Sequence, residues 1–125
     1  MPKIIIVQGV SKSFKTTGIV DAMNKLGIHV GKGGRDVLVS ARIQVDGHEC
    51  IVGFASGGDS EAIIRENIEF FRRINIAQSH IVFACRSRGV GIEILRAYAV
   101  ELDAEVVVIN SPRDDLDDEI IQNIP

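Results

Sequence analysis

A glycine, a lysine and a hydroxyl residue stand close together where the first apolar run of this chain ends. Gly9 directly follows the run, and Lys15 and Thr16 come six and seven residues later, at the start of a helical pattern. Backbone N–H groups in the first turn of a helix lack intrahelical acceptors, and the helix dipole adds partial positive charge there. Lys15 adds a full charge, and a hydroxyl such as that of Thr16 can ligate a Mg²⁺ ion that also contacts phosphate oxygens. The segment therefore predicts a site for an anion such as phosphate.

The same residues fit most of the phosphate-loop pattern G-x-x-x-x-G-K-[ST]. Gly9, Lys15 and Thr16 match, whereas Phe14 stands where the pattern has its second glycine. That glycine permits unusual dihedral angles and a close approach of phosphate to the backbone, so we expect the Phe14 ring to hinder both. The predicted phosphate-binding residues are Gly9, Ser11, Lys12, Ser13, Phe14, Lys15, Thr16 and Thr17. The alternative is an ordinary strand-to-helix loop with Phe14 tucked into the core.

The composition is that of one compact domain that can bury a core. The chain has 125 residues and 46% hydrophobic content, so we expect a single domain over 1–125, in which the acid-rich segment 112–125 forms a short helix or a flexible tail. The net charge of −3 argues against broad nucleic-acid binding. Cys50 and Cys85 lie in apolar runs, as free thiols in a reducing cytoplasm do. No apolar stretch approaches the ~20 residues that span a bilayer, so we expect a cytoplasmic protein that does not contact a membrane.

Apolar runs and helical periodicity predict the order β-α-ββ-α-β-α-β, with a final helix as one alternative for the chain end. The predicted strands are Lys3–Gln8, Val37–Val45, Cys50–Ala55, Ile81–Cys85 and Val106–Ile109, and the predicted helices are Lys15–Leu26, one from Asp59 or Ser60 to Ile74, and one ending at Asp103. Asp46 and Gly47 predict a tight hairpin turn. We therefore expect a three-layer α-β-α fold whose five-stranded sheet is mostly parallel, with one antiparallel hairpin strand and with the first strand at its centre.

Ligands of such folds bind outside the carboxyl ends of the strands. That rule brings four segments to one rim of the predicted sheet: Gly9–Thr16, Ser56–Asp59, Arg86–Arg88 and Asn110–Arg113.

With this loop and this order of elements, the chain resembles a P-loop nucleoside triphosphatase of minimal size. Its hairpin after the first helix resembles the layout of the small GTPases, and the resemblance covers residues 3 to 110 as an order of elements. It implies that Lys15 contacts the β- and γ-phosphates of a nucleoside triphosphate. It also implies that Thr16 ligates Mg²⁺.

The chain departs from that family at its second motif, an acidic residue at the end of the neighbouring strand, written D-x-x-G in GTPases. Gly58 matches this glycine, but Ala55 occupies the position of the aspartate. Asp59 is the candidate that orients a water or reaches the metal, and its alternative role is helix capping. Arg86-Ser87-Arg88 stands where GTPases carry their Asn-Lys-x-Asp guanine reader, so the sequence favours ATP over GTP.

Arg86 and Arg88 are the remaining catalytic candidates. Guanidinium groups at the end of a strand can stabilise a phosphoryl group in transfer, as in kinase-like P-loop proteins. Their alternative role is pairing with nearby carboxylates in a solvated loop.

Three functions follow from these residues. The first is a Mg²⁺-dependent enzyme that hydrolyses a nucleoside triphosphate or transfers its phosphoryl group. The second is a binding module that holds a nucleotide or another phosphorylated small molecule without turnover, acting through a homo-oligomer or a partner. The third is a structural α/β domain without a ligand.

Overall fold

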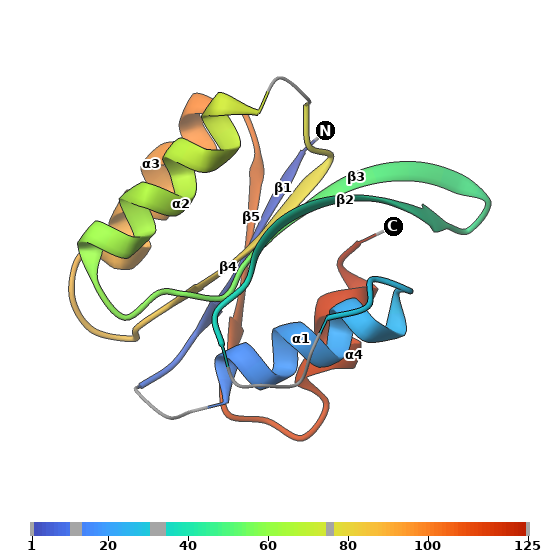
Figure 1. Cartoon of the computed structure of the whole chain (residues 1–125). Helices are drawn as coiled ribbons and strands as arrows, with labels where there is room; N and C mark the ends of the chain where they lie inside the picture. Colours follow the sequence, from blue (N-terminus) through green and yellow to red (C-terminus); the bar gives the residue numbers. More distant parts are fainter. Residues whose placement is uncertain (1, 11–13, 31–34, 75–76, 125) are drawn as a thin grey trace.

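The computed structural model describes residues 2–10, 14–30, 35–74 and 77–124. It has a five-stranded sheet of strand order β2-β3-β4-β1-β5 between two pairs of helices (Figure 1). The strands are β1 (Lys3–Gln8), β2 (Leu38–Val45), β3 (His48–Ala55), β4 (His80–Cys85) and β5 (Glu105–Asn110). The helices are α1 (Lys15–Lys25), α2 (Glu61–Arg73), α3 (Gly91–Glu101) and α4 (Leu116–Gln122). The predicted three-layer fold is confirmed.

The isoleucine-rich first strand contributes side chains to the hydrophobic cores on both faces of the sheet. Alternate side chains of a strand point to opposite faces, so Ile5 packs with α1 and α4 while Ile4 and Ile6 pack with α2 and α3. Strand β1 pairs in parallel with β4 and β5 and is covered on both faces, as predicted. The prediction that the first strand lies at the centre of the sheet is wrong, however. Strand β4 occupies the centre, because β2 and β3 lie on one side of it and β1 and β5 on the other.

The hairpin forms as the sequence predicts. Asp46 and Gly47 have φ angles of 50° and 80°, the left-handed values that a two-residue turn requires. Strand β2 therefore runs antiparallel to β3, with Leu38 opposite Ala55 and Val45 opposite His48. Strand β3 in turn pairs in parallel with β4. The beginning of β2 thus lies beside the end of β3.

The acid-rich end of the chain adopts the helical alternative. Leu116, Ile120 and Ile124 are buried in the core beneath α1, and Lys25 forms ion pairs with Asp117 and Asp118 at 2.7 and 3.0 Å. Figure 1 shows α4 (red) beside α1 (blue) on the same face of the sheet. Among the helices of the described residues, none combines the length and apolar composition that a membrane crossing requires.

Candidate functional site

The carboxyl ends of β1, β3, β4 and β5 meet at one edge of the sheet, because these strands run in parallel. Backbone hydrogen bonds join the segments that follow them. The Gly9 N–H donates to the Cys85 carbonyl at 3.1 Å, and the Ser87 N–H donates to the Gly9 carbonyl at 3.3 Å. The Ser111 N–H donates to the Gln8 carbonyl at 2.8 Å. The predicted rim is therefore a connected structure.

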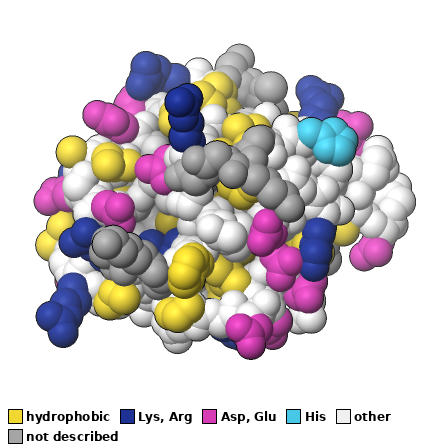
Figure 2. Space-filling view, turned by 60° about the horizontal axis from the view of Figure 1, so that its bottom comes forward, with side chains coloured by type: hydrophobic (Ala, Val, Ile, Leu, Met, Phe, Trp, Pro, Cys, Tyr) yellow, Lys and Arg dark blue, Asp and Glu magenta, His cyan; other side chains and the backbone are white. Residues whose placement is uncertain are grey.

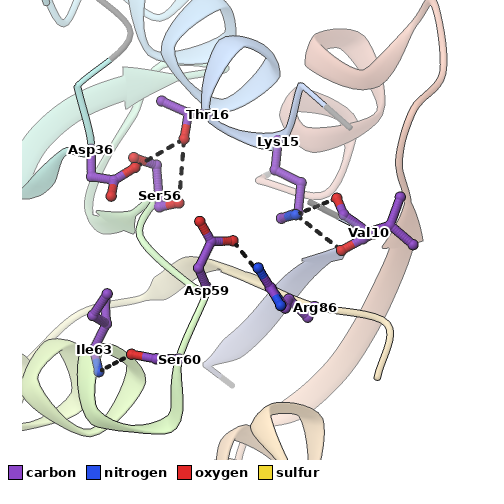
Figure 3. A network of polar contacts seen from close by, with 10 residues as sticks. Val10, Lys15, Thr16, Asp36, Ser56, Asp59, Ser60, Ile63 and Arg86 are labelled. Atoms are coloured by element: carbon purple, nitrogen blue, oxygen red, sulfur yellow. Dashed lines mark hydrogen bonds and ion pairs between the residues drawn. The ribbon is translucent and has the colours of Figure 1, made fainter. Parts of the chain in front are cut away.

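Lys15 lies inside the turn that links β1 to α1. Its ammonium donates hydrogen bonds of 2.9 Å to the carbonyl oxygens of Gly9 and Val10, and only 7% of the residue is exposed (Figure 3). The side chain thus folds back from the first turn of α1 over the end of β1. The predicted contacts of Ser11, Lys12 and Ser13 lie outside the described residues. The described part of the turn places a cation at the amino end of a helix.

Phe14 lies at the surface at the start of α1. It is the N-cap of α1 with φ 63° and ψ 28°, and it is 68% exposed. The prediction that its ring is tucked into the core is wrong, because the side chain is exposed to solvent. The residue takes the backbone conformation that a glycine adopts most readily. The ring lies beside the exposed Thr17 at a hollow of about 320 Å³ that the segment after β5 also lines.

Thr16 contacts an acidic residue that sequence reasoning missed. Its hydroxyl lies 3.1 Å from Oδ1 of Asp36 and 3.4 Å from the carbonyl oxygen of Ser56 (Figure 3). Asp36 stands just before β2 and is brought here by the pairing of β2 with β3. The signal that could have identified it is its place two residues ahead of a strand whose antiparallel partner ends at the rim.

The segment after β3 packs tightly against the end of β4. A Cβ atom at Gly58 would lie 2.0 Å from the Ala84 carbonyl oxygen, so only glycine fits there without a shift of the backbone. Asn67 of α2 is buried and donates a 2.8 Å hydrogen bond to the Gly57 carbonyl. The resemblance places the second-motif aspartate at the position of Ala55, on a strand next to β1, but β4 separates β3 from β1, and Ala55 and Ser56 at the end of β3 are both buried. The described residues thus place no carboxylate at the end of β3 itself.

Asp59 and Arg86 face each other across this rim. Oδ1 of Asp59 lies 3.7 Å from Nε of Arg86, and both side chains are exposed. Asp59 is not the helix cap, because the Ser60 hydroxyl accepts the 3.2 Å hydrogen bond from the Ile63 N–H at the start of α2. Arg88 is exposed on the same loop as Arg86. The structure therefore brings Asp59 and Arg86 together.

Cys85 ends β4 below this turn and is buried. Burial raises the pKa of its thiol to about 11, although the nearby positive charge of Lys15 lowers the pKa in part. A neutral thiol is a poor nucleophile, and Cys85 packs in the hydrophobic core that α2 and α3 cover.

The surface around the rim carries charges of both signs. Figure 2 shows basic (dark blue) and acidic (magenta) side chains interspersed on the face that includes the lower edge of Figure 1. Among the residues that the structure describes, no group of at least three His, Cys, Asp or Glu side chains could hold a metal ion. A metal at the rim would therefore need hydroxyl, carbonyl, water or ligand oxygens in addition to carboxylate.

A larger hollow of about 670 Å³ lies between α2 and α3. Arg72 and Glu101 pair across it at 2.6 Å, and the Arg72 guanidinium lies 5.4 Å from the centre of the Tyr98 ring. The bond to Arg72 holds the pKa of Glu101 below its usual value. Arg72 of this hollow is thus already engaged by Glu69 and Glu101.

Comparison with protein-family models and with curated proteins finds no match for this chain. The function must therefore be argued from the residues at the rim.

Proposed function

We propose that the β1–α1 turn binds the phosphates of a nucleoside triphosphate together with Mg²⁺, and that the protein is a small, degenerate member of the P-loop nucleoside triphosphatases. The observation that carries the proposal is the position of the Lys15 ammonium, buried over the end of β1 at the amino end of α1. Two of the groups that it contacts are carbonyl oxygens, which are neutral. Hydrogen bonds from an ammonium to phosphate are stronger than those to neutral acceptors, so an incoming phosphate can compete for this cation.

The conformation of Phe14 supports the same proposal. The main objection from the sequence was that a side chain at this position hinders the backbone shape of a phosphate loop. Because Phe14 adopts a left-handed φ of 63° and its ring is mostly exposed, the turn has the backbone form that glycine would give it. The side chain of Phe14 therefore does not prevent the unusual dihedral angles of this turn.

In the catalytic form of the proposal, Arg86 stabilises negative charge on the transferred phosphoryl group and Asp59 orients the attacking water or acceptor. Arg88 is a second cation on the same loop. Mg²⁺, when bound, would neutralise charge between the phosphates, and Thr16 would hold it. We favour ATP over GTP because Arg86-Ser87-Arg88 replaces the guanine reader of GTPases. A reducing cytoplasm is the proposed compartment, and two buried free thiols agree with it.

A non-catalytic binding module is the second candidate, and one observation favours it. Buried Ala55 and Ser56 stand at the end of β3, where the resemblance placed the metal-positioning acid. The strand that does neighbour β1 on this side is β4, and it ends at buried Cys85 rather than at an acid. Asp59 is also engaged with Arg86. Binding without turnover is the outcome if no other acid positions the metal.

The test is a titration of ATP and GTP, with and without Mg²⁺, against wild type and Lys15→Met. This variant keeps most of the buried side-chain volume while removing the charge. Loss of a charge-assisted hydrogen bond costs about 1.5 to 3 kcal/mol, so ATP affinity should fall about tenfold or more.

Lys25→Met is the matched control, because Lys25 lies at the other end of α1 and pairs with Asp117 and Asp118. It should bind ATP as wild type does. Phosphate release during steady incubation with Mg²⁺·ATP separates the enzyme from the binding module. Equal affinity of wild type and a folded Lys15→Met for ATP would refute the proposed phosphate site.

A further inference from the structure

Three oxygen groups converge beside the first turn of α1. They are the Thr16 hydroxyl, the Asp36 carboxylate and the Ser56 carbonyl, which come from three different parts of the chain (Figure 3). Hydroxyl, carboxylate and carbonyl oxygens are the hard ligands that Mg²⁺ takes in proteins. The inference drawn from them rests on the proposed function, because phosphate oxygens and water would have to complete the coordination.

Asp36 is held in this place by the residue that follows it. The Val37 N–H donates a 2.7 Å hydrogen bond to the Ser56 hydroxyl, and the Ser56 N–H donates a 3.0 Å hydrogen bond to the Val37 carbonyl. This reciprocal pair extends the pairing of β2 with β3 to the rim. The backbone at Asp36 is therefore fixed relative to the segment after β3.

Gly57 leaves room for the carboxylate. A Cβ atom at Gly57 would lie 3.1 Å from Oδ2 of Asp36, which is closer than side chains normally approach. The Asp36 carboxylate therefore lies directly over this glycine. One of its oxygens faces Thr16 and the other faces the segment after β3.

The spacing of the oxygens fits a shared metal ion. Mg²⁺ binds oxygens at 2.0–2.1 Å in an octahedron, so adjacent ligand oxygens lie about 2.9 Å apart. Thr16 Oγ1 and Asp36 Oδ1 are 3.1 Å apart, while Thr16 Oγ1 and the Ser56 carbonyl oxygen are 3.4 Å apart. The first pair can become adjacent ligands with almost no movement. The second pair needs a shift of about half an ångström.

We propose that Asp36 and Thr16 together bind Mg²⁺, with Asp36 supplying the carboxylate that the end of β3 lacks. Asp59 is the competing acid on the rim, but its carboxylate faces the Arg86 guanidinium at 3.7 Å. Asp36 instead faces the Thr16 hydroxyl. When a metal ion replaces the hydrogen bond between them, this hydroxyl can rotate so that its oxygen lone pairs face the cation. In this arrangement Thr16 of α1 and Asp36, just before β2, would hold the metal beside the bound phosphates.

The test measures metal binding directly, with Mn²⁺ as a paramagnetic substitute for Mg²⁺. Water-proton relaxation distinguishes protein-bound Mn²⁺·ATP from the free complex, and ATP binding in EDTA is measured in parallel. In metal sites the loss of even an indirect partner costs about 10- to 100-fold in affinity. Asp36→Asn should therefore weaken Mn²⁺·ATP binding at least about tenfold, and it should not weaken binding of metal-free ATP, because it removes a negative charge.

Thr16→Val should give a similar loss of Mn²⁺·ATP affinity through the other ligand. Asp46→Asn is the matched control, since it makes the same chemical change in the hairpin turn at the far end of β2, where asparagine tolerates the φ of 50°. It should bind Mn²⁺·ATP as wild type does.

The outcomes separate the two proposals. If wild type binds ATP and a folded Asp36→Asn keeps full affinity for Mn²⁺·ATP, the Asp36 metal site is overturned, and the contact with Thr16 is a hydrogen bond at a helix end only. The phosphate site survives that result. If wild type binds no ATP with or without metal, both proposals fall.

Discussion

Replacing Phe14 tests the backbone shape on which the phosphate site depends. Phe14 has φ 63° and ψ 28°, a left-handed conformation that costs an L-residue about 1–2 kcal/mol. Glycine avoids this cost, but it lowers the folding stability by about 0.4–1 kcal/mol relative to alanine, because glycine gives the unfolded chain more conformational entropy. Phe14→Gly and Phe14→Ala remove the same ring, so its contacts cancel in their comparison. We expect Phe14→Gly to be more stable than Phe14→Ala by about 0.5–1 kcal/mol.

Urea denaturation of the two variants measures this difference, and thermal unfolding should show it as a Tm about 2 to 5 °C higher for glycine. Thr17 provides the control, because it is an exposed residue in the first turn of the same helix. There the order should reverse, with Thr17→Ala more stable than Thr17→Gly by roughly 1 kcal/mol.

An equal or greater stability of Phe14→Ala would show that residue 14 is not left-handed in solution. The turn would then lack the backbone form that the proposed phosphate site requires. If glycine is favoured, Phe14→Gly should also bind ATP at least as tightly as wild type, because it keeps the turn and removes only an exposed ring.

Further predictions concern the elements that support the rim. Gly58→Ala should lower the free energy of unfolding by about 1–3 kcal/mol in urea titrations, because its Cβ would meet backbone atoms of Ala84. Gly57→Ala should cost less, since its Cβ would meet only side-chain atoms that can move. Asn67→Ala should cost about 1–3 kcal/mol by leaving the Gly57 carbonyl without its donor, and a cost near zero would contradict this. The neutral thiol of Cys85 should stabilise the fold fully below pH 9.0, and this contribution should be lost as the pH rises from 9.0 to about 11. The difference in unfolding free energy between wild type and Cys85→Ala should shrink over that window.

The fold was predictable because its signals are local. A continuous run of isoleucine predicts a strand covered on both faces, and Asp46-Gly47 predicts the turn that reverses the chain. Gly27, with φ 86°, ends α1 as expected. The position of β1 within the sheet was wrong because strand order depends on packing between segments that are far apart in the sequence.

The site was less predictable, for two physical reasons. The pattern at Phe14 reports a residue type, whereas phosphate binding requires a backbone conformation, and phenylalanine can adopt that conformation at a cost. Asp36 is 20 residues from Thr16 in the chain. Only the register of β2 on β3 brings the two together, and sequence periodicity does not fix register across strands.

The antiparallel edge strand explains why an acid from such a position can reach the rim. In a wholly parallel sheet every strand ends at the ligand edge, so an acid that meets the ligand must follow a strand. Strand β2 runs the other way, and its beginning lies beside the end of β3. Asp36 therefore reaches the rim by preceding its strand.

The Val37–Ser56 hydrogen bonds join the segment before β2 to β3. A metal held by Asp36 would therefore stabilise the start of β2 when the ligand binds. Hydrogen exchange at the Val37 amide should accordingly slow on addition of Mg²⁺·ATP in wild type, and it should not slow in Asp36→Asn if that carboxylate is the link.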